Sequence, residues 1–124
     1  MERVSFITIE EKDDLIVSFV IEDAEPGEIK SLILMRSPKY EFVFEDHERG
    51  VNVSHEDQPD VEDDLLRQIS LTPDVVTIDS TYNRYELDIS RVDKKELEKA
   101  CTILRRMNFD DRFTLELFGG CVQN

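Results

Sequence analysis

The run LIVSFVI, residues 15–21, decides the fold because apolar side chains occupy both of its alternating sets of positions. A strand covered on both faces shows this pattern, which is typical of the centre of a sheet. We therefore expect a central strand from Leu15 to Glu22. The run is much shorter than the roughly 20 apolar residues that a membrane-spanning helix needs.

The sequence around this run alternates polar and apolar residues with period two, as strands with one buried face do. Short segments rich in glycine, proline, aspartate and asparagine separate the alternating runs and are typical of turns. Further strands are predicted at residues 4–9, 29–35, 40–45, 51–54, 75–80, 85–89 and 112–118.

Two segments have the spacing of helices instead. The first follows a predicted cap at Asp60 and places four apolar side chains on one face: Val61, Leu65, Leu66 and Ile69. The second follows Asp93, with Glu96 three residues later as an acidic variant of the capping box, and is predicted to end at Asn108. Its apolar stripe consists of Leu97, Ala100, Cys101, Leu104 and Met107.

Together these elements predict an α+β fold, with a mainly antiparallel sheet of about eight strands and two helices packed on one face. The 124 residues suit one domain, residues 1–124, because so short a chain has too little apolar surface for two cores. Residues 119–124 begin with a glycine pair and are expected to form a frayed tail.

The charge of the chain is strongly acidic, with 15 Lys and Arg against 29 Asp and Glu and a net charge of −14. Such a field repels phosphates and anionic lipid heads, so we expect neither a nucleic acid nor a membrane as partner. Residues 41–65 concentrate the acidity, since Arg49 is their only basic residue. Their ten acidic residues are Glu41, Glu45, Asp46, Glu48, Glu56, Asp57, Asp60, Glu62, Asp63 and Asp64.

The two cysteines, Cys101 and Cys121, are too few for the disulfide framework of a small secreted domain and do not form a Cys-x-x-Cys pair. We therefore interpret both as reduced thiols. The N-terminal residues alternate polar with apolar side chains and do not resemble a secretory signal. These two observations predict a cytoplasmic protein.

Motifs for catalysis, phosphate binding or zinc binding are not found in the sequence. His47 and His55 are accompanied by acidic residues and could share a divalent metal, but histidines in acidic loops are more often exposed residues that offset nearby carboxylates. We accordingly predict no catalytic residue, no metal and no cofactor.

Three aromatic residues, Tyr40, Phe42 and Phe44, alternate in the predicted strand 40–45 and would share one face of it. Such a row usually belongs to a core, and its alternative role is to line a ligand pocket between sheet and helices. Tyr82 and Arg84 lie in a predicted hairpin turn, where exposed aromatic and arginine side chains favour recognition.

The leading functional hypothesis is a small acidic binding protein that presents the surface around residues 41–65 to a basic protein partner. The predicted contact residues are Glu56, Asp57, Asp60, Glu62, Asp63, Asp64, Tyr82 and Arg84. In size and acidity the chain is similar to bacterial immunity and antitoxin proteins and to small products of mobile gene cassettes, which implies an inhibitor or adaptor. The alternative is a small-molecule-binding domain, or a weakly specific enzyme, with Tyr40, Phe42 and Phe44 in its pocket.

A homodimer is also expected from the central strand. If both helices cover one face of the sheet, the second apolar face of residues 15–21 needs another cover. Ile16 and Val20 on that face could then meet the same residues of a second copy.

Overall fold

The structure is a computed structural model that describes residues 1–22, 30–55 and 64–118. The described strands are β1 Glu2–Glu11, β2 Leu15–Glu22, β3 Lys30–Arg36, β4 Asn52–His55, β5 Leu66–Leu71, β6 Val75–Ser80, β7 Arg84–Asp88 and β8 Thr114–Leu117. The helical segments are the α-helix α1 Lys94–Met107 and the short 3-10 helices η1 Pro38–Val43 and η2 Asp46–Glu48. The predicted tail, residues 119–124, lies outside the described residues.

All eight described strands join one sheet in the order β4-β3-β2-β1-β7-β6-β5-β8. Most neighbouring strands are antiparallel, but β1 is parallel to β7 and β5 is parallel to β8. The fold is therefore mixed α/β and mostly strands, with one α-helix in the part of the chain described. The prediction of an antiparallel sheet with two helices is matched only in part.

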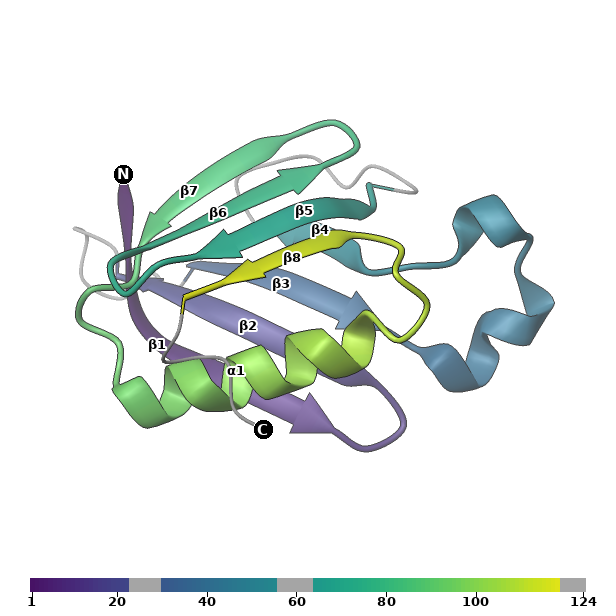
Figure 1. The fold of residues 1–124 in the computed structure, drawn as a ribbon, viewed down its shortest axis with the longest axis horizontal. Helices are drawn as coiled ribbons and strands as arrows, with labels where there is room; N and C mark the ends of the chain where they lie inside the picture. Colours follow the sequence, from purple (N-terminus) through teal and green to yellow (C-terminus); the bar gives the residue numbers. More distant parts are fainter. Residues whose placement is uncertain (23–29, 56–63, 119–124) are drawn as a thin grey trace.

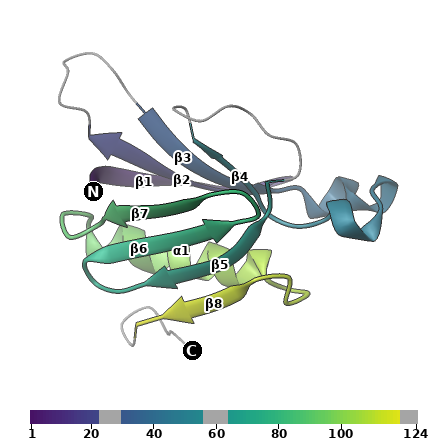
Figure 2. The ribbon, with the colours of Figure 1, turned by 90° about the horizontal axis from the view of Figure 1, so that it is seen from above.

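The sheet bends sharply between β1 and β7, because these strands pair only through Glu2↔Leu87 and Arg3↔Asp88. The two halves, β4 to β1 and β7 to β8, then face each other across a shared core (Figures 1 and 2). The segment that contains β4 also meets the start of β5, since Val53 N donates to Asp64 O at 2.9 Å and Leu66 N donates to Val51 O at 2.8 Å. The sheet thus curls into an incomplete barrel around one hydrophobic core.

Helix α1 lies at the remaining opening of this barrel, where it contacts β1, β2 and β8. Asp93 is its N-cap, as predicted, and its side chain accepts a hydrogen bond from Lys95 N at 2.8 Å. The C-cap at Asn108 is confirmed as well. Glu96 reaches β1, where its Oε1 accepts a hydrogen bond from Ile7 N at 3.3 Å, and so ties the helix to a strand.

The predicted helix that begins at Asp60 is wrong where the structure describes it, because Leu66–Leu71 is strand β5. Leu66 and Ile69 are both buried although they are three residues apart. A β-bulge between Leu66 and Gln68 adds one residue to the strand, so the spacing imitates a helix. Residues 56–63 lie outside the described residues.

The predicted strand 40–45 is also wrong, because these residues belong to η1 and the turn that follows it. Pro38 stands at the start of η1, where its fixed φ favours a helical turn. Glu41 is buried, whereas the aromatic side chains around it are exposed. The aromatic residues whose alternation predicted a core strand are therefore exposed to solvent.

Cys101 is buried and disulfide-bonded, so the prediction of a reduced thiol at this position is wrong. Cys121 lies outside the described residues. Among the helices that the structure describes, none is long and apolar enough to span a membrane.

Candidate functional site

Residues 37–49, here called the arm, leave the sheet after β3 and return to it before β4. The arm consists of η1, a turn and η2, and it extends beyond the end of the sheet (Figure 1). Local backbone hydrogen bonds shape it, including Phe44 N to Glu41 O at 3.0 Å and Glu48 N to Glu45 O at 2.9 Å. The arm is a compact surface loop, a type of segment that is frequently functional.

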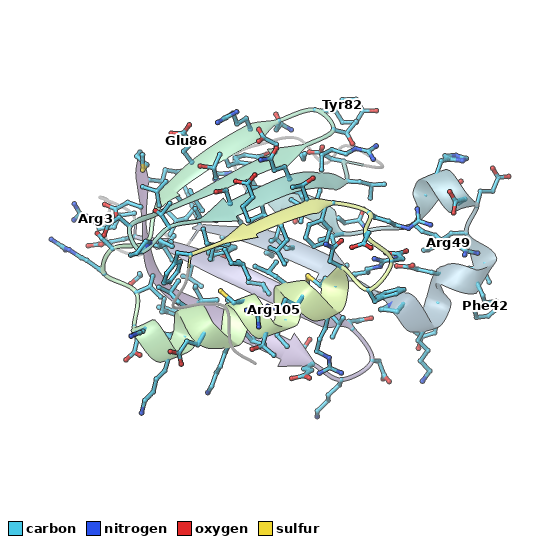
Figure 3. All side chains as sticks on the ribbon, in the orientation of Figure 1. Arg3, Phe42, Arg49, Tyr82, Glu86 and Arg105 are labelled. Carbon is cyan, nitrogen blue, oxygen red and sulfur yellow. The ribbon has the colours of Figure 1, made fainter. Side chains whose placement is uncertain are left out.

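Exposed apolar side chains gather on the arm. The exposed fraction is 77% for Phe42, 67% for Val43, 50% for Tyr40 and 41% for Phe44. Figure 3 shows Phe42 at the outer edge of the arm, directed away from the sheet. A group of large apolar side chains that a fold leaves in water is typical of a protein-binding surface, and aromatic residues are common among those that dominate binding energy.

A fully buried arginine holds the base of the arm. Arg36 Nε donates to Glu41 Oε2 at 2.8 Å and its Nη2 donates to Glu41 Oε1 at 2.9 Å. Its two Nη atoms also donate to the carboxylate of Asp110, each at 2.8 Å, and Nη1 donates to Met107 O at 2.7 Å. The ring of Phe109 covers the guanidinium, with its centroid 4.1 Å from Cζ. Arg36 thus joins β3, the arm and the end of α1.

A second arginine, Arg112, binds the C-terminal part of the arm, at Asp46 and Arg49. Arg112 donates from Nη1 to Asp46 O at 2.7 Å and to Arg49 O at 3.3 Å, and from Nη2 to Asp46 Oδ1 at 2.7 Å. Its Nε donates to Asp110 Oδ2, so Asp110 lies between the two arginines. Arg49 in turn donates from Nη2 to Phe44 O at 3.1 Å. These charge-assisted bonds fix the arm in the conformation that exposes its rings.

The hydrogen bonds that Asp110 accepts from Arg36 and Arg112 make the stability of this region depend on pH. Hydrogen bonds from Arg36 and Arg112 lower the pKa of Asp110 from 3.8 to about 2, although partial burial opposes this shift. A carboxyl group whose pKa is lower in the folded than in the unfolded protein stabilises the fold when the pH is above the unfolded-state pKa. This contribution is lost as the pH falls through the folded-state pKa. The stabilisation from Asp110 should therefore be complete well above pH 3.8, fall progressively as the pH drops toward 2, and vanish only below both pKa values.

We expect Asp110→Asn to reduce the free energy of unfolding at pH 6, with a difference from wild type that shrinks as the pH falls from about 4 toward 2. Urea unfolding at a series of pH values measures this difference. Asp13→Asn is the control, because Asp13 is 70% exposed and its carboxylate lies 3.4 Å from an exposed lysine. A difference for Asp110→Asn that stays constant across this range would refute the assignment.

The predicted contact residues are only partly described, since Glu56, Asp57, Asp60, Glu62 and Asp63 lie outside the described residues. Asp64 is buried, and its two oxygens accept hydrogen bonds from Tyr82 N at 3.0 Å and Asn83 Nδ2 at 3.1 Å. Its carboxylate therefore shapes the β6–β7 hairpin from within. Tyr82, 61% exposed, and Arg84 lie on that hairpin, and Figure 3 shows Tyr82 on a segment separate from the arm.

The two histidines have different surroundings. His47 lies on the arm with Glu45 and Glu48, and within the described residues these three form the one group whose ligand atoms could meet around a metal. His55 is buried, lies 3.1 Å from Glu2 Oε1 through Nε2, and stacks on Tyr85 with ring centroids 5.4 Å apart. The structure therefore does not place His47 and His55 in one candidate metal site.

Tyr85, the partly buried partner of His55, belongs to β7 and so to the hairpin that β7 forms with β6. Burial raises the pKa of Tyr85, and the charge of Asp64 raises it further. The phenol therefore stays neutral through the physiological range. We interpret Tyr85 and His55 as a packed contact between the two halves of the sheet, since His55 belongs to β4 and Tyr85 to β7.

Sequence reasoning missed Arg36, which organises the site. A signal was present, because Arg36 follows Leu32 and Leu34 at the same alternate positions of β3 and therefore points to the same buried face. An arginine at a core position requires buried acidic partners. The acidic residues after β3 could have suggested the pair with Glu41.

Comparisons of the chain with protein-family models, curated proteins and solved structures each find no match.

Proposed function

We propose that this chain is a small protein-binding domain that uses the arm, together with the acidic region 41–65, to bind a basic protein partner. In this role it would act as an inhibitor, an immunity-like protein or an adaptor. The observation that carries the proposal is the exposure of Tyr40, Phe42, Val43 and Phe44 on a loop held by a buried arginine. A buried ion-pair network that holds an exposed apolar surface in one conformation makes that surface well suited to bind a partner.

The two parts of the surface have different tasks in this proposal. The rings supply contact area that a partner can bury, and rigid aromatic side chains lose little conformational entropy on binding. The acidic residues of region 41–65 favour a basic partner and speed its approach. Among the acidic residues of the arm, Glu45 and Glu48 are not engaged by Arg36 or Arg112, and their carboxylates lie 3.6 Å and 3.8 Å from the ring of His47.

The small-molecule alternative loses the residues on which it depended. Tyr40, Phe42 and Phe44 are exposed on the arm and do not lie between the sheet and α1. The described hollows of the surface are lined by other residues of β1, β2, β3 and α1. The protein-binding proposal is therefore the one that the described geometry favours.

A cytoplasmic location and the absence of nucleic acid or membrane partners belong to the same proposal. The net charge of −14 supports the latter expectation. The disulfide of Cys101 weighs against the cytoplasm, because disulfides persist mainly in oxidising compartments. A thiol titration of protein isolated from the native host would decide between the two compartments.

Affinity capture from a lysate of the native host tests the proposal. We expect a basic protein to bind at low salt and to elute as salt rises, because ions screen charged surfaces. The double variant Glu62→Ser with Asp63→Ser should weaken capture, whereas Glu86→Ser with Glu116→Ser, which removes the same charge elsewhere, should not. Capture that both double variants weaken equally, or that salt does not affect, would contradict the proposal.

A further inference from the structure

The edge of strand β1 that faces helix α1 carries backbone groups without a partner strand in the described part of the chain. Strand β7 pairs only with the first two residues of β1. Ile7 N donates to Glu96 Oε1 of α1, so the N–H of Ile7 points away from β2. In an antiparallel pair, the backbone groups of every second residue point to the same side. The pairing of β1 with β2 is regular from Phe6 onward, so the N–H and C=O of Ile9 also point away from β2.

A hollow of about 420 Å³ lies beside this edge, between β1 and α1. Its lining consists of Ile9, Glu11, Lys99, Thr102 and Ile103. Ile9 packs against the core and Ile103 is buried in it, so these two side chains form an apolar floor. On the side away from β2, no hydrogen bond among residues 1–22, 30–55 and 64–118 uses the N–H or C=O of Ile9. The hollow therefore combines an apolar floor with an open backbone donor and acceptor.

Contacts between β1 and α1 bound the hollow at both ends. On one side of Ile9 along the strand, Ile7 N is hydrogen-bonded to Glu96. On the other side, Glu11 forms an ion pair with Arg106. A strand that ran along the whole edge of β1 would have to break both contacts. The end of a chain needs room only at Ile9, so the hollow fits a chain terminus better than a continuous strand.

The charges around the hollow favour a carboxylate over an amine. Lys95, Lys99 and Arg106 share one flank of α1, because they are spaced by one and two helical turns. Arg106 engages Glu11, and Glu96 already accepts a backbone hydrogen bond, whereas Lys99 forms no ion pair within the described residues. The net charge of −14 matters less here, because physiological salt screens exposed charges beyond about 8 Å. An occupant with a carboxylate near Lys99 therefore suits the local charge.

We propose that this hollow binds the free C-terminus of an extended peptide whose last side chain is apolar. In an antiparallel arrangement, the last residue donates its N–H to Ile9 O, and its carboxylate accepts from Ile9 N. The same carboxylate lies beside Lys99, and the last side chain lies over Ile9 and Ile103, because opposed residues share one face of a sheet. A simple organic acid has no N–H for Ile9 O, so the backbone groups favour a peptide. The site lies on β1 and α1 and goes beyond the function proposed for the arm.

Titration of the purified, isotope-labelled chain with short peptides, followed by NMR, tests the proposal. The probes are tetrapeptides that end in valine, leucine or phenylalanine, each with a free carboxylate and with a C-terminal amide. We expect at least one free peptide to shift the amide resonance of Ile9 saturably, and its amide to bind at least about tenfold more weakly. N-methylation of the last residue should weaken binding too, because it removes the N–H that meets Ile9 O.

Two charge reversals on α1 form a matched pair. Lys99→Glu should weaken binding of the free peptide at least about tenfold, because it places one carboxylate beside another. Lys94→Glu makes the same change of charge on another flank of α1 and should alter the affinity by less than about twofold. Both lysines are exposed, so both variants should fold, which urea unfolding checks.

The proposal is overturned if no free peptide binds at millimolar concentration, or if the free and amidated peptides bind equally. Equal weakening by both charge reversals also overturns it, as does binding that leaves the amide resonance of Ile9 unchanged. None of these results involves residues 37–49, so the failure of this site and the failure of the proposed function can be told apart.

Discussion

Replacing Arg36 by methionine should lower the free energy of unfolding by about 3–5 kcal/mol, because it leaves buried charge without a partner. Glu41 is buried and receives two hydrogen bonds from Arg36, so its carboxylate would lose both. Methionine has a similar length and is apolar, so the substitution tests the charge more than the volume. Urea unfolding at neutral pH measures the change.

Two further variants separate the cause of this effect. Arg84→Met removes an arginine that is 63% exposed and only loosely paired, and it should change stability by no more than about 0.5 kcal/mol. Adding Glu41→Gln to Arg36→Met should recover part of the loss, because it removes the unpaired charge. The account of Arg36 is wrong if Arg36→Met and Arg84→Met destabilise the fold equally.

The double variant Phe42→Ala with Phe44→Ala should weaken the affinity for the captured partner by at least about 30-fold, as expected when about 2 kcal/mol of anchoring contacts is removed. Its stability should stay within about 0.5 kcal/mol of wild type, because surface side chains contribute little to folding. Titration calorimetry with the partner measures the first quantity and urea unfolding measures the second.

Phe6→Ser is the control for this variant, since Phe6 is also an exposed phenylalanine but lies on β1. It should keep full affinity for the partner. Equal affinity for wild type and the arm variant would show that the rings of the arm are not anchors. A large loss of stability in the arm variant would show that Phe42 and Phe44 are structural.

The elements that the sequence predicts well are those whose local sequence pattern alone determines the secondary structure. Strand β2 follows from simple alternation, and its predicted bounds, Leu15–Glu22, are those of the structure. Helix α1 follows from its cap at Asp93 and its apolar stripe. In both elements local preference and tertiary burial agree.

The errors occur where a tertiary feature changes the spacing of a pattern. In β5, a bulge places Leu66 and Ile69 on one face, and the resulting spacing of three residues is that of a helix. Apolar residues are usually buried and charged residues exposed, but in the arm the hydrogen bonds from Arg36 keep Glu41 buried while Phe42 is exposed. A single sequence cannot distinguish a row of aromatic residues in a core from the same row on a binding surface, because both have period two.

The candidate site could therefore be located only approximately. The charge pattern indicates residues 41–65, and the arm, residues 37–49, overlaps the start of that region. The network that fixes the arm joins Arg36 to Asp110 and Arg112 to Asp46, residues more than 60 positions apart in the chain. Local patterns contain no information on pairs at such separations.

The most direct test of the central claim is hydrogen–deuterium exchange of the complex between this chain and its captured partner. We predict that binding slows exchange in residues 37–49 more than in any other described segment. Unchanged exchange in the arm, with protection confined to the β6–β7 hairpin or to another surface, would contradict the claim that the arm is the docking surface.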